Sequence, residues 1–150
     1  MIISMTTNGT IGTLIHHKGS KVWTIAATAT VFEAIEFLAQ KNIGALPVLD
    51  GEQLIGIFSE RDYTRKVALA GKSSRATLVR EIVSTAVVAV TSQHTIEEAM
   101  RLMTENRIRH LPVIDGGKMT GMVSIGDLVN WIISAQSATI DQMQSYLAGR

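Results

Sequence analysis

The sequence predicts an α/β (α+β) protein built from two copies of one β-α-β-β-α unit, and three observations lead to this fold class. The first is a duplication: "IGALPVLDGEQLIGIFSERD", from Ile43 to Asp62, returns as "IRHLPVIDGGKMTGMVSIGD", from Ile108 to Asp127, at a constant offset of 65 residues (108 − 43). The second is a capping box ahead of helical spacing in both copies, and the third is a hairpin turn in both. A duplication of this size indicates two supersecondary units that bury their apolar faces together.

Each copy is predicted to begin with a strand and a helix. The runs "VWTI" (Val22 to Ile25) and "VVAV" (Val87 to Val90) are short and rich in β-branched residues, which favour strands. Apolar residues at i, i+3, i+4 and i+7 then follow Thr30-x-x-Glu33 and Thr95-x-x-Glu98, which indicates an amphipathic helix behind a capping box. The apolar stripes are Val31, Ala34, Ile35 and Leu38, and Ile96, Ala99, Met100 and Met103.

The rest of each copy is predicted to be a hairpin and a second helix. Apolar runs flank Asp50-Gly51 and Asp115-Gly116, and Asp-Gly is a preferred two-residue hairpin turn. The second helix is expected to start after Ser59 in one copy and after Ser124 in the other, because serine is a preferred N-cap residue.

Five segments are expected along the chain. They are a lead-in with a helix (1–20), the first unit (21–67), a linker with a short helix (68–85), the second unit (86–132) and a C-terminal helix (133–150). The lead-in "TIGTLIHH" resembles "TLVREIV" of the linker, and each precedes a predicted strand. Apolar residues at helical spacings in the tail are expected to pack on the chain's own core or on a second subunit. They are Ile133, Ile140, Met143 and Leu147.

The composition argues against several classes of function. The chain has 150 residues, 46% of them hydrophobic, and its 14 basic and 13 acidic residues give a net charge of +1, which builds no broad field for nucleic acid. No apolar run approaches the roughly 20 residues that span a bilayer, and the start lacks the basic region of a signal peptide, so a cytoplasmic protein is expected. Because the sequence has no cysteine and no His-x-x-x-His pair, no metal site is predicted.

The ordered, duplicated set of Leu-Pro-Val-x-Asp-Gly followed by Ser-x-x-Asp resembles a pair of CBS domains (the cystathionine β-synthase type), also called a Bateman module. The resemblance covers about residues 10–132, and "SERDYTRKV" and "RIRHLPVIDGGKMTGMVSIGDLV" are similar to the small stand-alone members of bacteria and plant organelles. It implies two units packed about a pseudo-two-fold axis, with clefts between them that hold AMP, ADP, ATP, NAD or S-adenosylmethionine. It also implies a homodimer.

Both units carry a Ser-x-x-Asp at the predicted start of the second helix. On a local interpretation, Ser59 with Asp62 and Ser124 with Asp127 are capping boxes that satisfy the first N–H groups of a helix. On a functional interpretation, the helix N-terminus suits a phosphate, and the carboxylate accepts two hydrogen bonds from the vicinal hydroxyls of a ribose. The resemblance favours the ribose role for Asp127 in one cleft and for Asp62 in the other.

The resemblance also assigns the residues just before each Leu-Pro-Val to the clefts. The first cleft would use Ile43, Gly44 and Ala45 for the base, Asp127 for the ribose, and Arg109, His110 and Ser124 for the phosphate. A rigid fork of donors makes Arg109 suitable for phosphate oxygens. The alternative makes Arg109 a solvated charge at a strand edge and His110 a hydrogen-bonded core residue. Trp23 is either a wall on which a base stacks or, as is commoner, a buried tryptophan.

The second cleft reverses these roles and is expected to bind more weakly. It would use Ser59 and Asp62 for the ribose and Ile108, with the backbone of Arg109 and His110, for the base. Its phosphate positions correspond to Gly44 and Ala45, which carry no charge, although Arg61 or Arg65 can supply one from the helix start. The sequence therefore predicts unequal sites, with the tighter one on the Asp127 side.

No catalytic group is predicted, because the sequence offers no nucleophile, base and orienting residue at a suitable spacing. The expected function is a non-catalytic regulatory module that binds an adenosyl ligand, needs no metal, and passes its state to an unknown partner protein. Two alternatives stay open. One is an adaptor that binds a partner enzyme of the thioredoxin type independently of nucleotide, and the other is an enzyme that acts on nucleotides.

Overall fold

The chain folds into two compact units. The computed structural model describes residues 9–148, with side chains except at 136–142, 146 and 148. Residues Val22–Val87 form one unit, called here the first-repeat unit. The stretch that ends at Lys21 and the stretch that begins at Val88 together form the other, the second-repeat unit. Helices and small sheets in both units confirm the α/β class.

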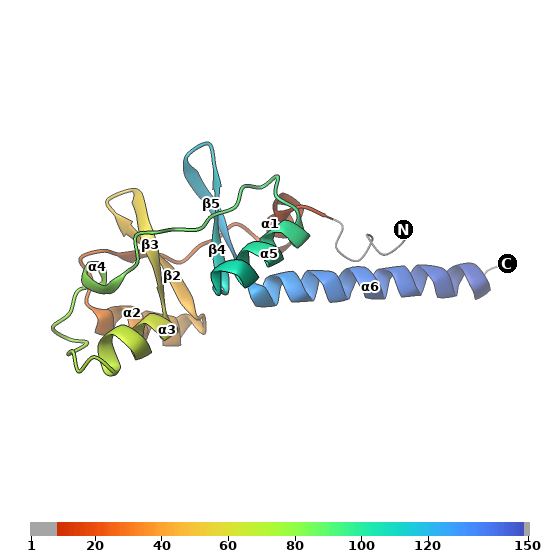
Figure 1. Cartoon of the computed structure of the whole chain (residues 1–150). Helices are drawn as coiled ribbons and strands as arrows, with labels where there is room; N and C mark the ends of the chain where they lie inside the picture. The colour runs from red at the N-terminus through yellow and green to blue at the C-terminus, as the bar shows by residue number, and fades with distance from the viewer. Residues whose placement is uncertain (1–8, 149–150) are drawn as a thin grey trace. The chain divides into compact units, whose positions relative to one another are not determined.

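The first-repeat unit is a three-stranded sheet with helices packed against it (Figure 1). Its elements are β1 (Ile25–Ala26), α2 (Val31–Lys41), β2 (Ala45–Asp50), β3 (Gln53–Ser59), α3 (Glu60–Asp62), a π-helical segment (Tyr63–Ala68) and α4 (Val79–Ile82). β1 runs parallel to β2, and β2 runs antiparallel to β3. Side chains from α2, β2, β3, the π-helical segment and α4 meet in one core, which includes Val31, Leu38, Leu46, Phe58, Val67 and Val79.

The second-repeat unit repeats this plan around a two-stranded hairpin. Its elements are α1 (Ile11–Lys18), α5 (Ile96–Asn106), β4 (His110–Asp115), β5 (Lys118–Ser124) and α6 (Ile125–Ala148). β4 and β5 are antiparallel. The core is formed by Ile11, Leu14, Val90, Ile96, Met103, Leu111, Val123 and Leu128.

The predicted helix caps and hairpin turns are confirmed. The backbone N–H of Glu33 donates to Thr30 Oγ1 over 3.1 Å, and the Thr30 N–H donates to Glu33 Oε1 over 2.9 Å. Thr95 and Glu98 make the same reciprocal pair over 3.0 and 2.9 Å at the start of α5. At the turns, Gly51 (φ 64°) and its counterpart Gly116 (φ 58°) adopt the left-handed conformation that favours glycine.

The predicted strands over Val22–Ile25 and Val87–Val90 are wrong in extent. β1 covers only Ile25–Ala26, and Val90 forms a single parallel bridge to Val113. The Val90 N–H donates to Pro112 O, and Val90 O accepts from the Ile114 N–H. The next rung toward the N-terminus would need an N–H from Pro112, which proline lacks. The proline of each Leu-Pro-Val therefore limits how far the preceding segment can pair.

Each lead-in packs on the repeat that does not follow it directly. α1 precedes the first repeat in the chain but lies in the second-repeat unit, where Ile11 and Leu14 are buried. The Ile11 N–H donates to His94 O over 2.8 Å. The other lead-in, α4, precedes the second repeat but lies in the first-repeat unit, where the Val79 N–H donates to Ala29 O over 2.8 Å. Both units are therefore completed by a helix from across a repeat boundary.

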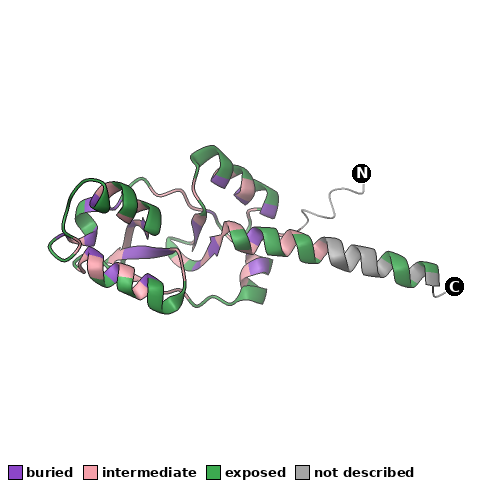
Figure 2. Cartoon of the chain, turned by 90° about the horizontal axis from the view of Figure 1, so that it is seen from below, coloured by how far each residue is buried: buried purple, intermediate pink, exposed green. Residues whose placement is uncertain are grey.

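The C-terminal helix predicted over 133–150 is the second part of α6, which begins at Ile125 and continues without interruption to Ala148. Leu128 is buried in the core, whereas three residues of the predicted apolar face are exposed by more than half, namely Ile133, Met143 and Leu147 (Figure 2). These three do not pack on their own unit, and the side chain of Ile140 lies outside the described ones. Among the described residues, no helix combines the length and apolarity needed to cross a membrane.

Candidate functional site

Within each unit, the residues before Leu-Pro-Val lie beside the start of the second helix. His110 pairs with Ser124 across the β4–β5 hairpin, and the Ile125 N–H donates to Arg109 O over 2.8 Å. The first-repeat unit repeats this arrangement, since the Glu60 N–H donates to Gly44 O over 3.1 Å. The predicted site residues thus form two groups, one in each unit. The Asp127 group contains Ile108, Arg109, His110, Ser124 and Asp127, and the Asp62 group contains Ile43, Gly44, Ala45, Ser59, Arg61 and Asp62.

In the Asp127 group, the carboxylate is held at the N-terminus of α6. Asp127 Oδ2 accepts from the Ser124 N–H over 2.8 Å, and the Asp127 N–H donates to Ser124 Oγ over 3.1 Å. The local interpretation, a capping box, is therefore realised. The same geometry directs an ionised acceptor toward the helix start, where the N–H dipoles favour anions. Capping and ligand binding are compatible, because Asp127 Oδ1 makes no hydrogen bond to any described residue.

A lysine that the sequence did not suggest completes this group. Lys18, the last residue of α1, places its Nζ 2.6 Å from Asp127 Oδ2 and donates to Met122 O over 2.6 Å. Side chains of the ion pair are partly accessible, 37% for Lys18 and 24% for Asp127. No local pattern points to this pair, because 109 residues separate the two partners.

The two cationic candidates of the group differ in their environment. Arg109 is exposed, whereas His110 is partly buried at the start of β4. Burial lowers the pKa of His110 below its ordinary value of 6.5, the charges of Lys18 and Arg109 lower it further, and Asp127 opposes them. His110 is therefore biased toward its neutral form, in which one ring nitrogen accepts a hydrogen bond and the other donates one.

The Asp62 group has the same cap but a different set of charges. Asp62 Oδ2 accepts from the N–H and the Oγ of Ser59, over 2.9 and 3.1 Å. Lys66, one turn further on, has its Nζ 3.5 Å from Asp62 Oδ1 and donates to Ile82 O over 3.0 Å. Ala45 is buried, and Arg61 is exposed at the helix start. α3 contains only three residues, and the helix continues after Asp62 as the π-helical segment.

Trp23 packs against helix α2 of its own unit. Its ring meets Phe37 edge-on with centroids 5.8 Å apart, and Lys41 Nζ lies 4.1 Å from its ring centroid. Trp23 is partly buried, which favours the interpretation of a tryptophan that packs within its own unit. A role as a stacking wall for a base stays a prediction.

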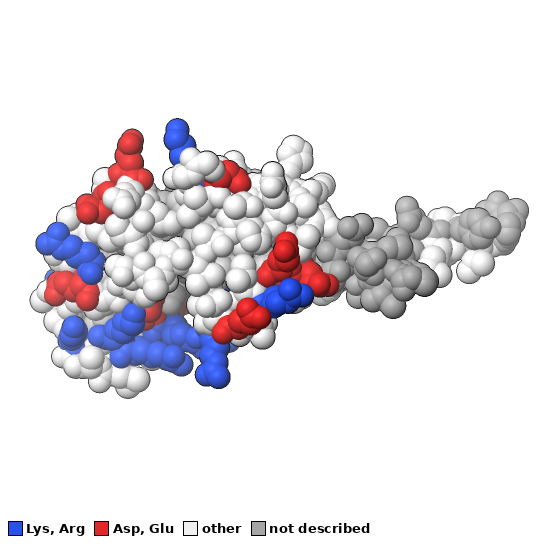
Figure 3. Space-filling model, turned by 45° about the horizontal axis from the view of Figure 1, so that its top comes forward, with Lys and Arg blue, Asp and Glu red and all other residues white. Residues whose placement is uncertain are grey.

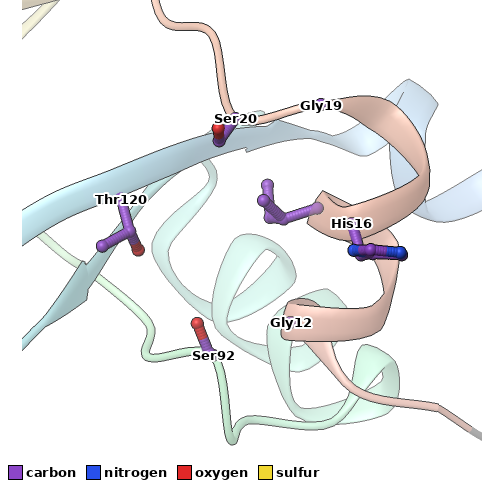
Figure 4. Close-up of a pocket in the computed structure, with 7 residues that line it drawn as sticks. Gly12, His16, Gly19, Ser20, Ser92 and Thr120 are labelled. Carbon is purple, nitrogen blue, oxygen red and sulfur yellow. The ribbon is translucent and has the colours of Figure 1, made fainter.

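A separate pocket lies in the second-repeat unit between α1 and the hairpin. It has a volume of about 410 Å³ and is lined by Gly12, Ile15, His16, Gly19, Ser20, Ser92 and Thr120 (Figure 4). Ser92 Oγ donates to Asp115 Oδ2 over 2.5 Å, and Thr120 Oγ1 donates to the same oxygen over 2.7 Å. The Ser92 and Thr120 hydroxyls are therefore engaged in internal hydrogen bonds, and the pocket shares no residue with the Asp127 group.

Charges are otherwise dispersed over the part of the chain that the structure describes. Figure 3 shows acidic and basic side chains on the same face, with wide uncharged areas and a group of basic side chains along its lower edge. No cluster of three or more His, Asp or Glu residues suited to a metal ion occurs among the described residues.

Three comparisons identify proteins similar to this chain. The family model described as "CBS domain" matches it twice, at residues 17–69 and 79–134. The mitochondrial CBS domain-containing protein CBSX3 of Arabidopsis thaliana is 41% identical over 136 residues, which are 87% of this chain and 66% of the plant protein. The chain thus spans about two thirds of the length of this relative.

Solved structures share the fold. A protein with CBS domains from Burkholderia ambifaria matches with a TM-score of 0.81 and 45% identity, over 83% of this chain and 94% of that one. A CBS domain pair solved in complex with 5′-methylthioadenosine and S-adenosyl-L-methionine matches with a TM-score of 0.69 and 22% identity, over 81% and 93% of the two chains. At 22% identity, the similarity to this second structure shows a shared fold and no more.

Proposed function

Because the chain belongs to the CBS-domain family, whose model matches it twice, we propose that it is a non-catalytic regulatory module that binds an adenosyl ligand and passes its state to a partner protein. The physiological compartment we propose is the cytoplasm. The ligand is an adenine nucleotide such as AMP, ADP, ATP or NAD, and no metal is required.

One observation carries the proposal. Asp127 is fixed at the start of a 24-residue helix by its hydrogen bond from Ser124, with one carboxylate oxygen that accepts no hydrogen bond from any described residue. An ionised carboxylate with spare acceptor capacity suits a pair of ribose hydroxyls, and the helix N-terminus beside it suits a phosphate. Arg109 and His110 add donors to the same group. The solved relative with bound adenosyl compounds gives this ligand class a precedent in the fold.

The ligand site we propose is composite. Ile43, Gly44 and Ala45 supply the base contacts, and the Asp127 group supplies the ribose and phosphate contacts. The reciprocal site uses Asp62 and Ser59 with Ile108. It is the weaker one, since Gly44 and Ala45 stand in place of Arg109 and His110 and offer no side-chain donor, and Asp62 is followed by a shorter α-helix.

Signalling follows from differential affinity. A ligand that contacts both units holds them in one relative arrangement, and a partner responds if it binds that arrangement more tightly than the ligand-free one. The chain acts as a homodimer, and the exposed apolar face of α6 supplies contact area for the second copy.

The proposal is tested by a thermal-shift panel of AMP, ADP, ATP, NAD and S-adenosylmethionine, with GTP as the control. A ligand at 100 times its dissociation constant stabilises the folded state by about 2.7 kcal/mol, which is a rise of several degrees in Tm for a chain of this size. A flat panel would contradict the proposal.

A second candidate function has its own observation. The exposed residues Ile133, Met143 and Leu147 on α6 also suit a nucleotide-independent adaptor whose target is a partner enzyme of the thioredoxin type. A partner that binds equally well with and without adenine nucleotide, and equally well after Asp127→Asn, would favour the adaptor.

A further inference from the structure

Asp127 belongs to the second repeat, whereas Lys18 belongs to α1, which lies outside that repeat in the sequence. α1 is the lead-in of the first repeat, yet its last residue makes the ion pair at Asp127 Oδ2 and the hydrogen bond to Met122 O, each over 2.6 Å. The contact with Met122 O on β5 fixes the ammonium at this position relative to the hairpin. Lys18 therefore occupies a fixed position beside Asp127.

The Lys18 ammonium retains capacity for a ligand. An ammonium has three N–H donors, and described residues accept from two directions, Asp127 Oδ2 and Met122 O. More than a third of the Lys18 side chain is accessible. One further acceptor can therefore approach it without displacing either existing partner.

The charges of the group favour an anion. Lys18 and Arg109 are both cationic, and Asp127 is the one acidic residue within the group. Burial is the main cause that lowers the pKa of His110, the charges of Lys18 and Arg109 lower it further, and the charge of Asp127 opposes them. A phosphate placed there is attracted by both cations and gains charge-assisted hydrogen bonds. A sulfonium ligand gains none of these contacts.

We propose that Lys18 is a specificity-determining residue of the Asp127 site, where it contacts a ligand phosphate and selects phosphorylated adenine nucleotides over uncharged or cationic adenosyl compounds. This inference rests on the proposed function, because it assigns the ligand class of the same site. It makes α1, rather than either repeat, the source of the selectivity.

A purely structural role for Lys18 has a different signature. If the ion pair only anchored α1, its removal would lower the affinity for every ligand alike, together with the stability. A partly exposed ion pair contributes little to stability, so the folded state should tolerate the loss. The two roles are therefore separable by comparing ligands of different charge in one variant.

The experiment is titration calorimetry of wild type, Lys18→Met and Lys18→Arg with ADP, ATP, 5′-methylthioadenosine and S-adenosylmethionine. Lys118→Met is the matched control, because it removes the same charge from the exposed start of β5 in the same unit. We expect Lys18→Met to weaken ADP and ATP about tenfold or more and to leave 5′-methylthioadenosine within about twofold, since a lost charge-assisted hydrogen bond is of that order. Lys18→Arg retains the preference for ADP and ATP.

Equal weakening of all four ligands, or none, would overturn the role of Lys18 while leaving the proposed function standing. A wild-type protein that binds none of these four ligands, and neither AMP nor NAD, would overturn the proposed function itself, and this inference with it.

Discussion

Gly56 and Gly121 occupy the same position in the two repeats but face different neighbours. A Cβ added to Gly56 would overlap the carbonyl oxygen of Ser84 and lie 2.6 Å from Val83 Cγ2. A Cβ added to Gly121 would lie 2.8 Å from the Cδ1 atom of Ile15. The first contact is with backbone, which cannot move cheaply, and the second is with the tip of a flexible side chain.

Gly56→Ala is therefore predicted to be the more damaging of the two substitutions. Overpacking of this kind costs about 1–3 kcal/mol, so we expect the free energy of unfolding to fall by that amount or more for Gly56→Ala and by less for Gly121→Ala. Urea unfolding of both variants and wild type measures the difference. Equal losses in the two variants would contradict the prediction.

Asp127→Asn is predicted to weaken adenine nucleotide binding more than Asp62→Asn does. Both substitutions keep the side-chain volume and remove one negative charge, but only Asp127 lies in a group with Arg109, His110 and Lys18. We expect a loss of about tenfold or more for Asp127→Asn, because a charged acceptor for ribose hydroxyls is removed. Isothermal calorimetry measures both. The assignment of the tighter site is wrong if Asp62→Asn abolishes binding and Asp127→Asn leaves it intact.

His110 is predicted to make stability depend on pH. Since burial lowers its pKa below the ordinary value of 6.5, the unfolded chain takes up the proton at a higher pH than the folded chain. The stability from neutral His110 is thus fully present above about 6.5 and is lost as the pH falls through the lower, folded pKa. As the pH falls from about 6.5 toward the lower pKa of folded His110, we expect the free energy of unfolding of wild type to fall more steeply than that of His110→Gln. Parallel pH profiles would refute this.

Ile133→Asp is predicted to convert a homodimer into a monomer. Ile133 is 54% exposed on α6, in line with other exposed apolar residues, and a buried carboxylate in a dimer interface would lack a partner. The Tm of the separated chain should change little, because the side chain is exposed within its own unit. Light scattering at micromolar concentration measures the mass. A monomeric wild type would remove the dimer from the proposal.

Local sequence patterns predicted the local structure well. The capping boxes at Thr30 and Thr95 and the Asp-Gly turns depend on residues no more than four positions apart, so the sequence contains all the information needed. The uninterrupted α6 could also have been predicted, since neither glycine nor proline occurs between Asp127 and Gly149. The family was likewise recognisable from the duplicated motifs, and the two family matches confirm it.

Features that depend on contacts between residues far apart in the sequence could not be predicted from local patterns. The length of β1 depends on the missing N–H of a proline in another strand, which an apolar run such as "VWTI" does not reveal. The ion pair of Lys18 joins residues 109 positions apart. The duplication matched "TIGTLIHH" with "TLVREIV", but this likeness does not indicate that α1 packs in the second-repeat unit.

The exchange of lead-in helices sets an order in which the protein can be completed during synthesis. The first-repeat unit is one continuous stretch, Val22–Val87, and can fold once that stretch has left the ribosome. α1 is synthesised earlier but must wait for β4 and β5, which are translated about a hundred residues later. The group around Asp127 is consequently assembled after the first-repeat unit, because the contact between Lys18 and Asp127 joins residues 109 positions apart and needs Asp127 to have left the ribosome.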